Sequence, residues 1–407
     1  YRTSNYGANW ELIVNGLDDP HGFTRVVRED PIRKGLLYAG TETGLYISLN
    51  SGDFWQPFQL NLPIVPINDL TFRHNDLIAA TAGRSFWILD DLSFLQTPKG
   101  SESQAFLAEP RDTYLFTGGY SEKPRPGLGQ NPKSGVLLNY YLPAVSDSTA
   151  VTLEILEEGQ VIRTFTNQPD KDFKTWPGGP PKPEVLPAKT GFNRFVWDFR
   201  RETLPAVENV FVMGDYRGSR VAPGAYTARL THEGVTSQKP FRILPHPGIQ
   251  ATQAAYTEQQ AALRQIDEAI RDMHGAVGQL RGVKTQLQAH QDLLEGNETA
   301  EELLSKGVTL QEEISTWEEN LIQPKQKTFQ DVINFNNQLN AELMNLRSYI
   351  DVAEPELTQG AKERLSDLLG MWNTMSRERD TIVNKGMAEY NALYRQLELP
   401  ALIMEEN

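Results

Sequence analysis

The sequence predicts a multidomain protein in which a β-rich part precedes an α-rich part. The chain has 407 residues, more than a single hydrophobic core usually serves. Residues 1–250 hold nearly all the proline and most of the glycine, whereas residues 251–400 are rich in Ala, Glu, Gln, Leu and Lys. From repeats and periodicity we expect the last blades of an incomplete β-propeller over residues 1–100, an antiparallel β-sandwich over 101–246 and an antiparallel four-helix bundle over 247–407.

Two segments near the N-terminus share one pattern. Thr3–Trp10 and Ser48–Trp55 both read hydroxyl-x-Asn-x-Gly-x-x-Trp, and they lie 45 residues apart, the length of a four-stranded propeller blade. The pattern favours a β-hairpin turn, because the Asn bonds its own backbone, the Gly supplies a positive φ and the Trp packs between sheets. Its structural positions are Thr3, Asn5, Gly7, Trp10, Ser48, Asn50, Gly52 and Trp55.

Strand-like segments flank these turns. Leu36–Thr41 and Gly44–Ile47 recur about 40 residues later as Asp76–Thr81 and Ser85–Leu89. The second copy runs into Asp90-Asp91, where neither Gly nor Trp follows at the expected spacing. We therefore expect a degenerate third turn, as terminal repeats often have, and roughly two blades where a closed propeller needs at least about four. Upstream blades or a partner chain are expected to complete the propeller.

The two strand pairs carry a family resemblance. Gly35–Tyr46 and Gly83–Asp91 resemble the closing blades of bacterial Asp-box, or BNR-repeat, proteins, which are often labelled glycosyl hydrolases and are related in their propellers to sortilin. One departure is Ala82, which stands where that family commonly has His before Gly-Arg-Ser. The resemblance implies a propeller that offers a recognition surface. Arg84, Asp90 and Asp91 are candidates for that surface, and the alternative is that Asp90 and Asp91 only form a turn leaving the last strand.

The middle of the chain has the pattern of an antiparallel sandwich, since short apolar or alternating runs are separated by Gly, Pro and Asp. The runs are Val136–Leu142, Val151–Leu156, Val161–Thr166, Asn193–Phe199, Ala225–Thr231 and Pro240–Leu244. Gly191–Arg200 followed by Ala222–Thr227 resembles the Ig-like module of flagellar hook-capping proteins. Such modules usually space or bind, and the resemblance implies no catalysis.

Two Pro- and Gly-rich loops, Lys123–Gly135 and Lys174–Lys189, interrupt the predicted sandwich. The second loop contains Trp176. One hypothesis is a docking loop that displays Trp176, and the other is an ordered loop packed on a neighbouring domain.

After the linker Pro245–Gly248, apolar residues recur at steps of three and four in four successive seams. We expect breaks between them at Gly296-Asn297, Pro324 and Glu354-Pro355. We expect either an up-and-down bundle of four helices or a long helical hairpin arrangement, because four helices of matching length joined by short breaks can bury their seams against one another. The alternative is a seam for a partner chain, so the bundle is also a candidate for oligomerisation.

Composition excludes several partners and chemistries. The formal net charge of −14, with no basic cluster, opposes nucleic acid, and no run of about 18 apolar residues could span a membrane. With no cysteine there is no disulfide, thiolate ligand or cysteine nucleophile, which fits a reducing cytosol or an exported bacterial protein without disulfides. The six histidines show no metal-ligand spacing. We predict no catalytic residue, metal or cofactor.

These observations lead us to expect the non-catalytic binding or scaffolding part of a larger bacterial BNR-repeat protein, which recognises protein or carbohydrate. We expect it to be exported, in the periplasm, on the cell surface or outside the cell, with any signal upstream of Tyr1 because the chain opens inside a repeat. One alternative is the accessory C-terminal half of a glycoside hydrolase whose active site lies in upstream blades. Another is a subunit of a cell-envelope or secretion-linked assembly.

Overall fold

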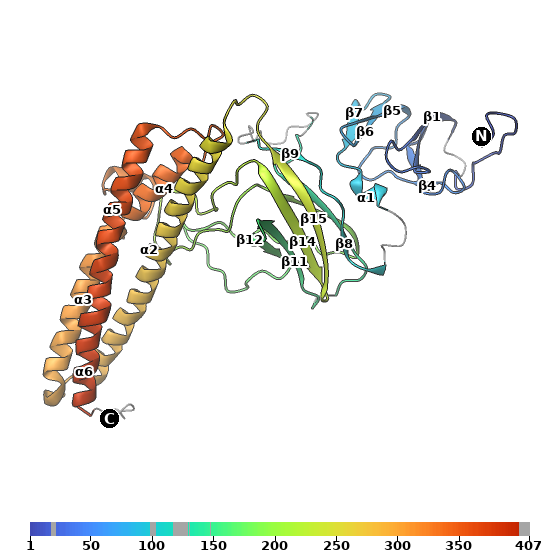
Figure 1. Cartoon of the computed structure of the whole chain (residues 1–407). Helices are drawn as coiled ribbons and strands as arrows, with labels where there is room; N and C mark the ends of the chain where they lie inside the picture. The colour runs from blue at the N-terminus through green and yellow to red at the C-terminus, as the bar shows by residue number, and fades with distance from the viewer. Residues whose placement is uncertain (18–21, 98–102, 117–128, 130, 147, 399–407) are drawn as a thin grey trace.

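The computed structural model describes residues 1–17, 22–97, 103–116, 129, 131–146 and 148–398. Figure 1 shows three regions in a row: the N-terminal sheets, a two-sheet region in the middle and a long helical region. The expected order of a β-rich part followed by an α-rich part is therefore confirmed. Most of the predicted loop Lys123–Gly135 lies outside the described residues.

The N-terminal sheets are two small antiparallel meanders that share one core. The first contains β1 (Thr24–Glu29), β2 (Leu37–Thr41), β3 (Leu45–Ser48) and β4 (Gln56–Pro57), and the second contains β5 (Ile67–Arg73), β6 (Asp76–Thr81) and β7 (Phe86–Leu89). β5 packs against β1 and β2. Gly40 permits this contact, because a Cβ there would lie 2.7 Å from Ile67 and 2.8 Å from Val26.

After the short helix α1 (Ser93–Gln96), the two-sheet region begins. One sheet has the order β13-β10-β8 and the other β12-β11-β14-β15-β9, and only the β15–β9 pair is parallel among the described strands. The bounds are β8 Phe106–Leu107, β9 Thr113–Tyr114, β10 Val136–Leu142, β11 Val151–Glu157, β12 Gln160–Thr166, β13 Gly191–Trp197, β14 Gly224–His232 and β15 Val235–Leu244. Five of the six predicted runs thus lie within strands, and the sixth, Asn193–Phe199, extends two residues beyond the end of β13.

Both sheets contribute to one core, and Trp197 lies fully buried within it. The Trp197 ring has Phe199, Tyr226 and Phe241 as neighbours, with ring centroids 5.9–6.2 Å away. The edge-to-face geometry of the Tyr226 and Phe241 contacts is a favourable arrangement for aromatic pairs. Alternation along the strands places these large rings on the inner faces, as the sequence pattern indicates.

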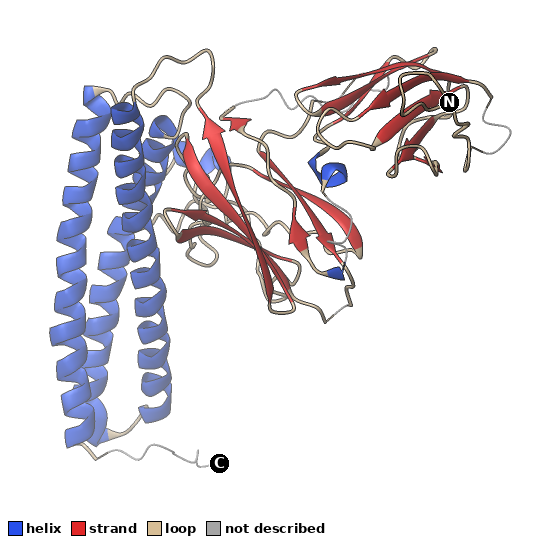
Figure 2. Cartoon of the chain, turned by 45° about the vertical axis from the view of Figure 1, so that its right-hand side comes forward, coloured by secondary structure: helices blue, strands red, loops and turns tan. Residues whose placement is uncertain are grey.

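Long helices make up the third region (Figure 2). They are α2 (Gln253–Leu294), α3 (Glu301–Leu321), α4 (Leu339–Ile350), α5 (Gln359–Thr381) and α6 (Ala388–Gln396), with the π-helical segment η4 (Ile382–Met387) joining the last two. The Thr252 hydroxyl accepts a hydrogen bond from the Ala255 N–H and caps α2, and Thr358 caps α5 in the same way. The three expected breaks are confirmed.

The expected up-and-down arrangement of four matched helices is wrong. α3 and α4 run in the same direction, one after the other, along α2. Glu318 of α3 pairs with Arg281, whereas Arg347 of α4 pairs with Asp267, nearer the start of α2. The chain thus passes along the helical region three times. α2 is the first pass, α3 and α4 together form the interrupted second pass, and α5, η4 and α6 form the third. The break near Pro324 ends a helix without reversing the chain, and a sequence break alone does not distinguish these outcomes.

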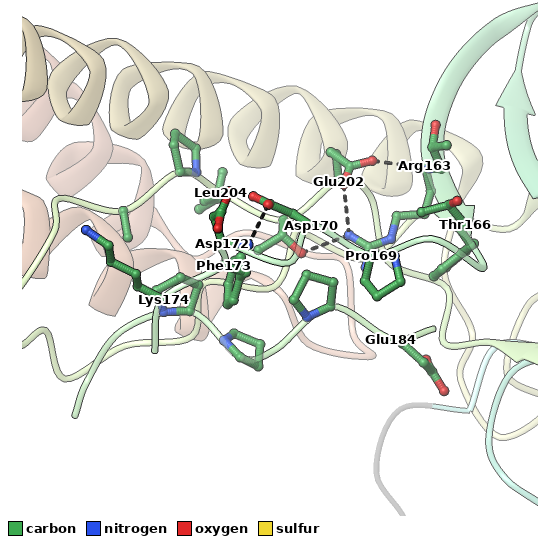
Figure 3. Close-up of a pocket in the computed structure, with 18 of the residues that line it drawn as sticks. Arg163, Thr166, Pro169, Asp170, Asp172, Phe173, Lys174, Glu184, Glu202 and Leu204 are labelled. Carbon is green, nitrogen blue, oxygen red and sulfur yellow. Dashed lines mark hydrogen bonds and ion pairs between the residues drawn. The ribbon is translucent and has the colours of Figure 1, made fainter. Parts of the chain in front are cut away.

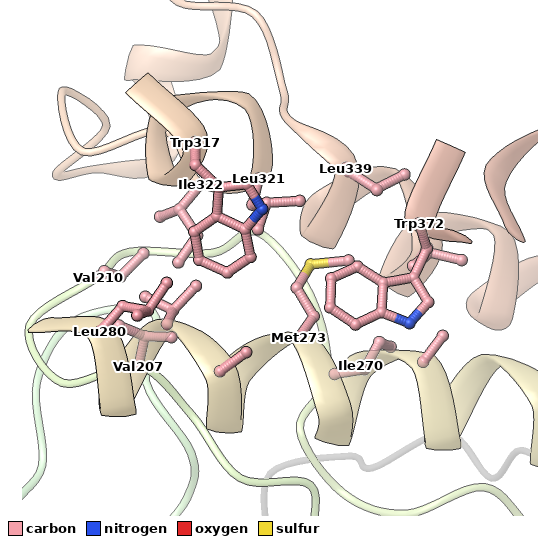
Figure 4. Close-up of a cluster of buried hydrophobic side chains, with 14 of the residues drawn as sticks. Val207, Val210, Ile270, Met273, Leu280, Trp317, Leu321, Ile322, Leu339 and Trp372 are labelled. Atoms are coloured by element: carbon pink, nitrogen blue, oxygen red, sulfur yellow. The ribbon is translucent and has the colours of Figure 1, made fainter. Parts of the chain in front are cut away.

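The helical core also contains a segment that comes from the two-sheet region. Between β13 and β14, residues 204–216 extend onto α2, and five of their side chains join the helical core. Figure 4 shows Val207 and Val210 beside Leu280 of α2. The expected boundary at residue 246 does not reveal this insertion, because a short Val-rich loop has no helical period that would assign it to the bundle. The predicted helical seams themselves pack against one another within the chain.

Among the described residues, no helix combines the length and the apolar character needed to cross a membrane.

Two buried tyrosines provide a test of this packing. The Tyr216 hydroxyl is buried without a hydrogen-bond partner among the described residues, whereas the Tyr226 hydroxyl donates to the Ala222 carbonyl at 2.7 Å. Tyr216→Phe removes an unsatisfied polar group, and we expect the free energy of unfolding to rise by about 1 kcal/mol. Tyr226→Phe is the matched control and is expected to lower it by a similar amount. Urea unfolding measures both, and a loss of stability in Tyr216→Phe would contradict the assignment.

Candidate functional site

The two sequence boxes have the same local structure. In the first, Thr3 Oγ1 accepts from the Gly7 N–H at 2.8 Å and Asn5 Oδ1 accepts from the Asn9 N–H at 2.9 Å. In the second, Ser48 Oγ accepts from the Gly52 N–H at 2.9 Å and Asn50 Oδ1 accepts from the Phe54 N–H at 3.1 Å. Each box is therefore a side-chain-stabilised turn, as the sequence predicts.

Backbone angles in the two boxes also agree. Gly7 and Gly52 have φ of 89° and 91°, and the residues before them, Tyr6 and Ser51, have φ of 55° and 62°. The glycine thus occupies the left-handed region that its lack of a Cβ makes accessible. The hydroxyl, Asn and Gly positions all serve the turn, so these positions have a structural role.

The tryptophans of the two boxes lie in different surroundings. Trp55 is 2% exposed, and its Nε1 donates to the Ile13 carbonyl at 2.9 Å. Trp10 is 62% exposed. Trp55 packs against the segment that follows the first box. The prediction that both tryptophans pack between sheets is wrong for Trp10, and for Trp55 the structure shows burial against that segment.

Of the candidate surface residues, only Arg84 is exposed. It lies in the β6–β7 turn, where its carbonyl accepts from Trp87 Nε1. Asp91 is buried, and its carboxylate accepts from Asn139 Nδ2 at 2.8 Å. Arg194 of β13 donates to the backbone carbonyls of Asp90 and Asp91. Asp90 and Asp91 therefore form part of a junction, which we call the first junction, between the N-terminal sheets and the two-sheet region.

Burial affects the charged groups of the first junction. It raises the pKa of Asp90 above its ordinary value, and the charge of Asp76 adds to this shift. It lowers the pKa of Arg194, although the charges of Asp91 and Asp90 oppose that shift. Sequence reasoning missed Arg194 and Asn139. The available signal was a single Arg in a strand of aromatic and apolar residues, and the identity of its partners requires the fold.

A second polar junction, which we call the second junction, joins the two-sheet region to the helices. Arg347 of α4 donates to Asp267 Oδ1 at 3.2 Å and to the carbonyls of Asp215 and Arg217. Arg200 donates to Asp351 Oδ2 at 3.2 Å. Burial raises the pKa of Asp351, and Arg220 and Arg200 oppose that shift.

A groove of about 710 Å³ opens beside this junction (Figure 3), within the roughly 300–1,000 Å³ common for ligand sites. The Pro-rich loop after β12 forms one wall. The segment after β13, with Arg271 of α2, forms the other. Trp176 lines the groove, and its Nε1 donates to the Val210 carbonyl at 2.8 Å. Trp176 therefore packs on a neighbouring segment, and it also lines the groove.

Within the part of the chain that it describes, the structure shows neither a metal-binding cluster nor a buried carboxylate in the groove. Among the described residues, no group of three or more His, Asp or Glu side chains could hold a metal ion. The groove carboxylates Asp170, Asp172 and Glu184 are exposed, without the burial that would set one of them apart as an acid. What the groove provides is a shaped surface with charges and flat apolar side chains.

Comparisons with known proteins give no assignment: no protein-family model matches the chain, and neither the curated proteins nor the solved structures include a match.

The burial of His274 predicts a pH dependence for the contact between the two-sheet and helical regions. It is buried, its Nδ1 lies 2.8 Å from the Pro205 carbonyl, and burial lowers its pKa below the ordinary 6.5. Below about pH 6.5 His274 binds a proton in the unfolded chain, whereas in the folded chain its lowered pKa keeps it neutral to a lower pH. Stability is therefore expected to fall as the pH drops below about 6.5, by at most about 1.4 kcal/mol per pH unit from this residue.

The measurement is urea unfolding of the wild-type protein and of His274→Gln between pH 7.5 and 5. The difference in unfolding free energy between the two proteins should change with pH in the direction stated above. A difference that stays constant across this range would contradict a buried, neutral His274.

Proposed function

We propose that the chain is the non-catalytic binding and scaffolding part of a larger exported protein with a BNR-repeat propeller, which recognises protein or carbohydrate. The observation that carries the proposal is the repeated turn, with equivalent side-chain hydrogen bonds in the boxes at Thr3–Trp10 and Ser48–Trp55. The proposed family is that of Asp-box proteins related to sortilin, and the proposed domains are terminal propeller blades, an Ig-like sandwich and a helical bundle.

Strand pairing supports the propeller part of this proposal. The second box joins β3 to β4, and Ile47 pairs with Gln56. The first box closes a bridge between Arg2 and Glu11, at positions 45 residues earlier. Both boxes thus link two paired antiparallel segments, as a repeated blade requires.

Unpaired surfaces on the N-terminal sheets support a need for further repeats. β7 pairs with β6, and no further described strand pairs with its other edge. Its side chains Phe86 and Ile88 are 73% and 58% exposed. Exposed apolar edge strands are commonly covered in native proteins. We propose that upstream blades or a partner chain cover them and complete the propeller.

The scaffolding part of the proposal rests on the two junctions. Each joins neighbouring regions through buried charged or polar side chains, Asp91 with Asn139 at one end and Arg200 with Asp351 at the other. Such contacts require well-defined geometry, and breaking one of them leaves a buried polar or charged group without its partner. They would hold the three regions in a fixed order relative to one another, and this suits a protein that positions a recognition surface.

Catalysis is tested with a panel of aryl glycosides. We expect neither the 407-residue chain nor a version extended N-terminally through the preceding repeats to release aryl alcohol above the buffer rate. Turnover by the extended protein alone would favour the accessory half of a glycoside hydrolase. Turnover by the 407-residue chain would contradict a non-catalytic role outright. Recovery of the extended protein in a stable complex with another envelope protein would favour the assembly alternative.

A further inference from the structure

The groove between the two-sheet region and α2 has an unequal distribution of charge. Five carboxylates line it, and three cationic side chains, Arg163, Lys174 and Arg271, accompany them. The acidic residues are Asp170, Asp172, Glu184, Glu202 and Glu208. Because carboxylates outnumber cations, the groove favours a ligand that carries positive charge.

The three cations already donate to oxygen atoms of the groove. Lys174 Nζ donates to Glu208 Oε1 at 2.8 Å. Arg163 Nη1 donates to Thr203 Oγ1 at 2.9 Å and lies 3.4 Å from Glu202 Oε1. Arg271 Nη2 donates to the Glu202 carbonyl at 3.1 Å. Each cation is thus paired with an oxygen of the protein, and Glu202 and Glu208 are the carboxylates that lie beside them.

Three carboxylates remain available to such a ligand. Asp170, Asp172 and Glu184 are exposed, and none of them forms an ion pair within the part of the chain that the structure describes. Asp170 Oδ1 accepts one hydrogen bond, from the Asp172 N–H at 2.9 Å. A carboxylate has about four acceptor sites, so each of the three can still receive ammonium or guanidinium donors.

Apolar surface lies between these charges. Pro180, Pro181 and Pro183 of the Pro-rich loop line the groove, and Pro205 lies on the opposite wall. Proline has no N–H, so this wall offers few backbone donors and contacts a ligand through flat, rigid rings. Trp176 adds an aromatic face that can pack on an aliphatic stem or on a cation.

The groove is held open by bonds across its base. Trp176 Nε1 donates to the Val210 carbonyl, and the Val212 N–H donates to the Gly178 carbonyl at 3.3 Å. Val210 and Val212 belong to the segment packed in the helical core. The walls are therefore formed before any ligand arrives, which lowers the entropic cost of binding.

We propose that this groove binds an extended peptide segment in which Lys or Arg residues alternate with proline or aliphatic residues. The basic side chains pair with Asp170, Asp172 and Glu184, and the intervening residues pack on the prolines and Trp176. A neutral oligosaccharide fits less well, because it carries no positive charge to pair with these carboxylates. This inference names a ligand for the proposed scaffold and so rests on that non-catalytic binding function.

The test uses the whole 407-residue chain and fluorescein-labelled decapeptides at low ionic strength. One peptide alternates Lys with Pro and Leu, and a second has Glu in place of every Lys. Fluorescence anisotropy measures binding, with unlabelled cellohexaose as a competitor. We expect saturable binding of the Lys peptide, weakening as salt is added, no binding of the Glu peptide and no competition by the sugar.

A matched pair of variants separates the groove from net charge. The triple variant Asp170→Asn, Asp172→Asn and Glu184→Gln removes three negative charges from the groove, and the amide introduced by Asp170→Asn keeps an acceptor for the loop. The control triple Glu295→Gln, Glu312→Gln and Glu319→Gln removes three exposed charges from the helical region. We expect about tenfold weaker binding in the groove variant, with the control near wild type.

Equal weakening in both triple variants would overturn the proposal, since net charge would then explain the binding. Absence of saturable binding of the Lys peptide, or displacement of that peptide by cellohexaose, would also overturn it. Thermal unfolding of each variant confirms that the fold is kept. None of these outcomes bears on glycoside hydrolysis, so the failure of this inference remains distinguishable from the failure of the proposed function.

Discussion

The second junction is the contact on which the arrangement of the two larger regions depends. Arg347 is 3% exposed and lies between Asp267 of α2 and two backbone carbonyls of the segment before β14. Asp267 also accepts a hydrogen bond from the Ser219 hydroxyl at 2.8 Å. A buried charge is tolerated only when its partners are all in place, so this set of residues constrains both regions at once.

Much of the remaining structure follows from that constraint. The segment before β14 is held against α2 and α4, and its valines fill the helical core. The same segment provides one wall of the groove and anchors the opposite wall through Val210. The first junction does similar work at the other end of the two-sheet region, where Arg194 and Asn139 reach Asp90 and Asp91. A substitution at either junction should therefore alter the packing of both regions that the junction joins.

Local sequence patterns predicted the local structure well. The spacing of hydroxyl, Asn and Gly in the two boxes predicted turns whose hydrogen bonds are equivalent, and apolar periodicity predicted the helices and their breaks. Each of these signals lies within a few residues of its effect. The direction of α4 after Pro324 was not predictable in this way, because the contact that determines it joins Arg347 to Asp267, 80 residues away.

The candidate site was predicted only in part. Trp176 was identified from its Pro- and Gly-rich surroundings, but the carboxylates around the groove come from loops without periodicity and are brought together by the fold alone. Asp91 was a candidate for either a recognition surface or a turn leaving the last strand, and its burial against Asn139 was visible only in the fold. Arg200 and Asp351 are 151 residues apart, and nothing local to either one indicates the other.

The central role of the buried Arg347–Asp267 pair is tested most directly by a double-mutant cycle. The cycle measures the unfolding free energies of Arg347→Met, Asp267→Leu and the double variant. We predict that each single change costs about 3–5 kcal/mol, because it leaves one charge buried without its partner. The double variant should then recover a large part of that loss. Single changes that cost under about 1 kcal/mol, or costs that simply add in the double variant, would contradict the central role of this buried pair.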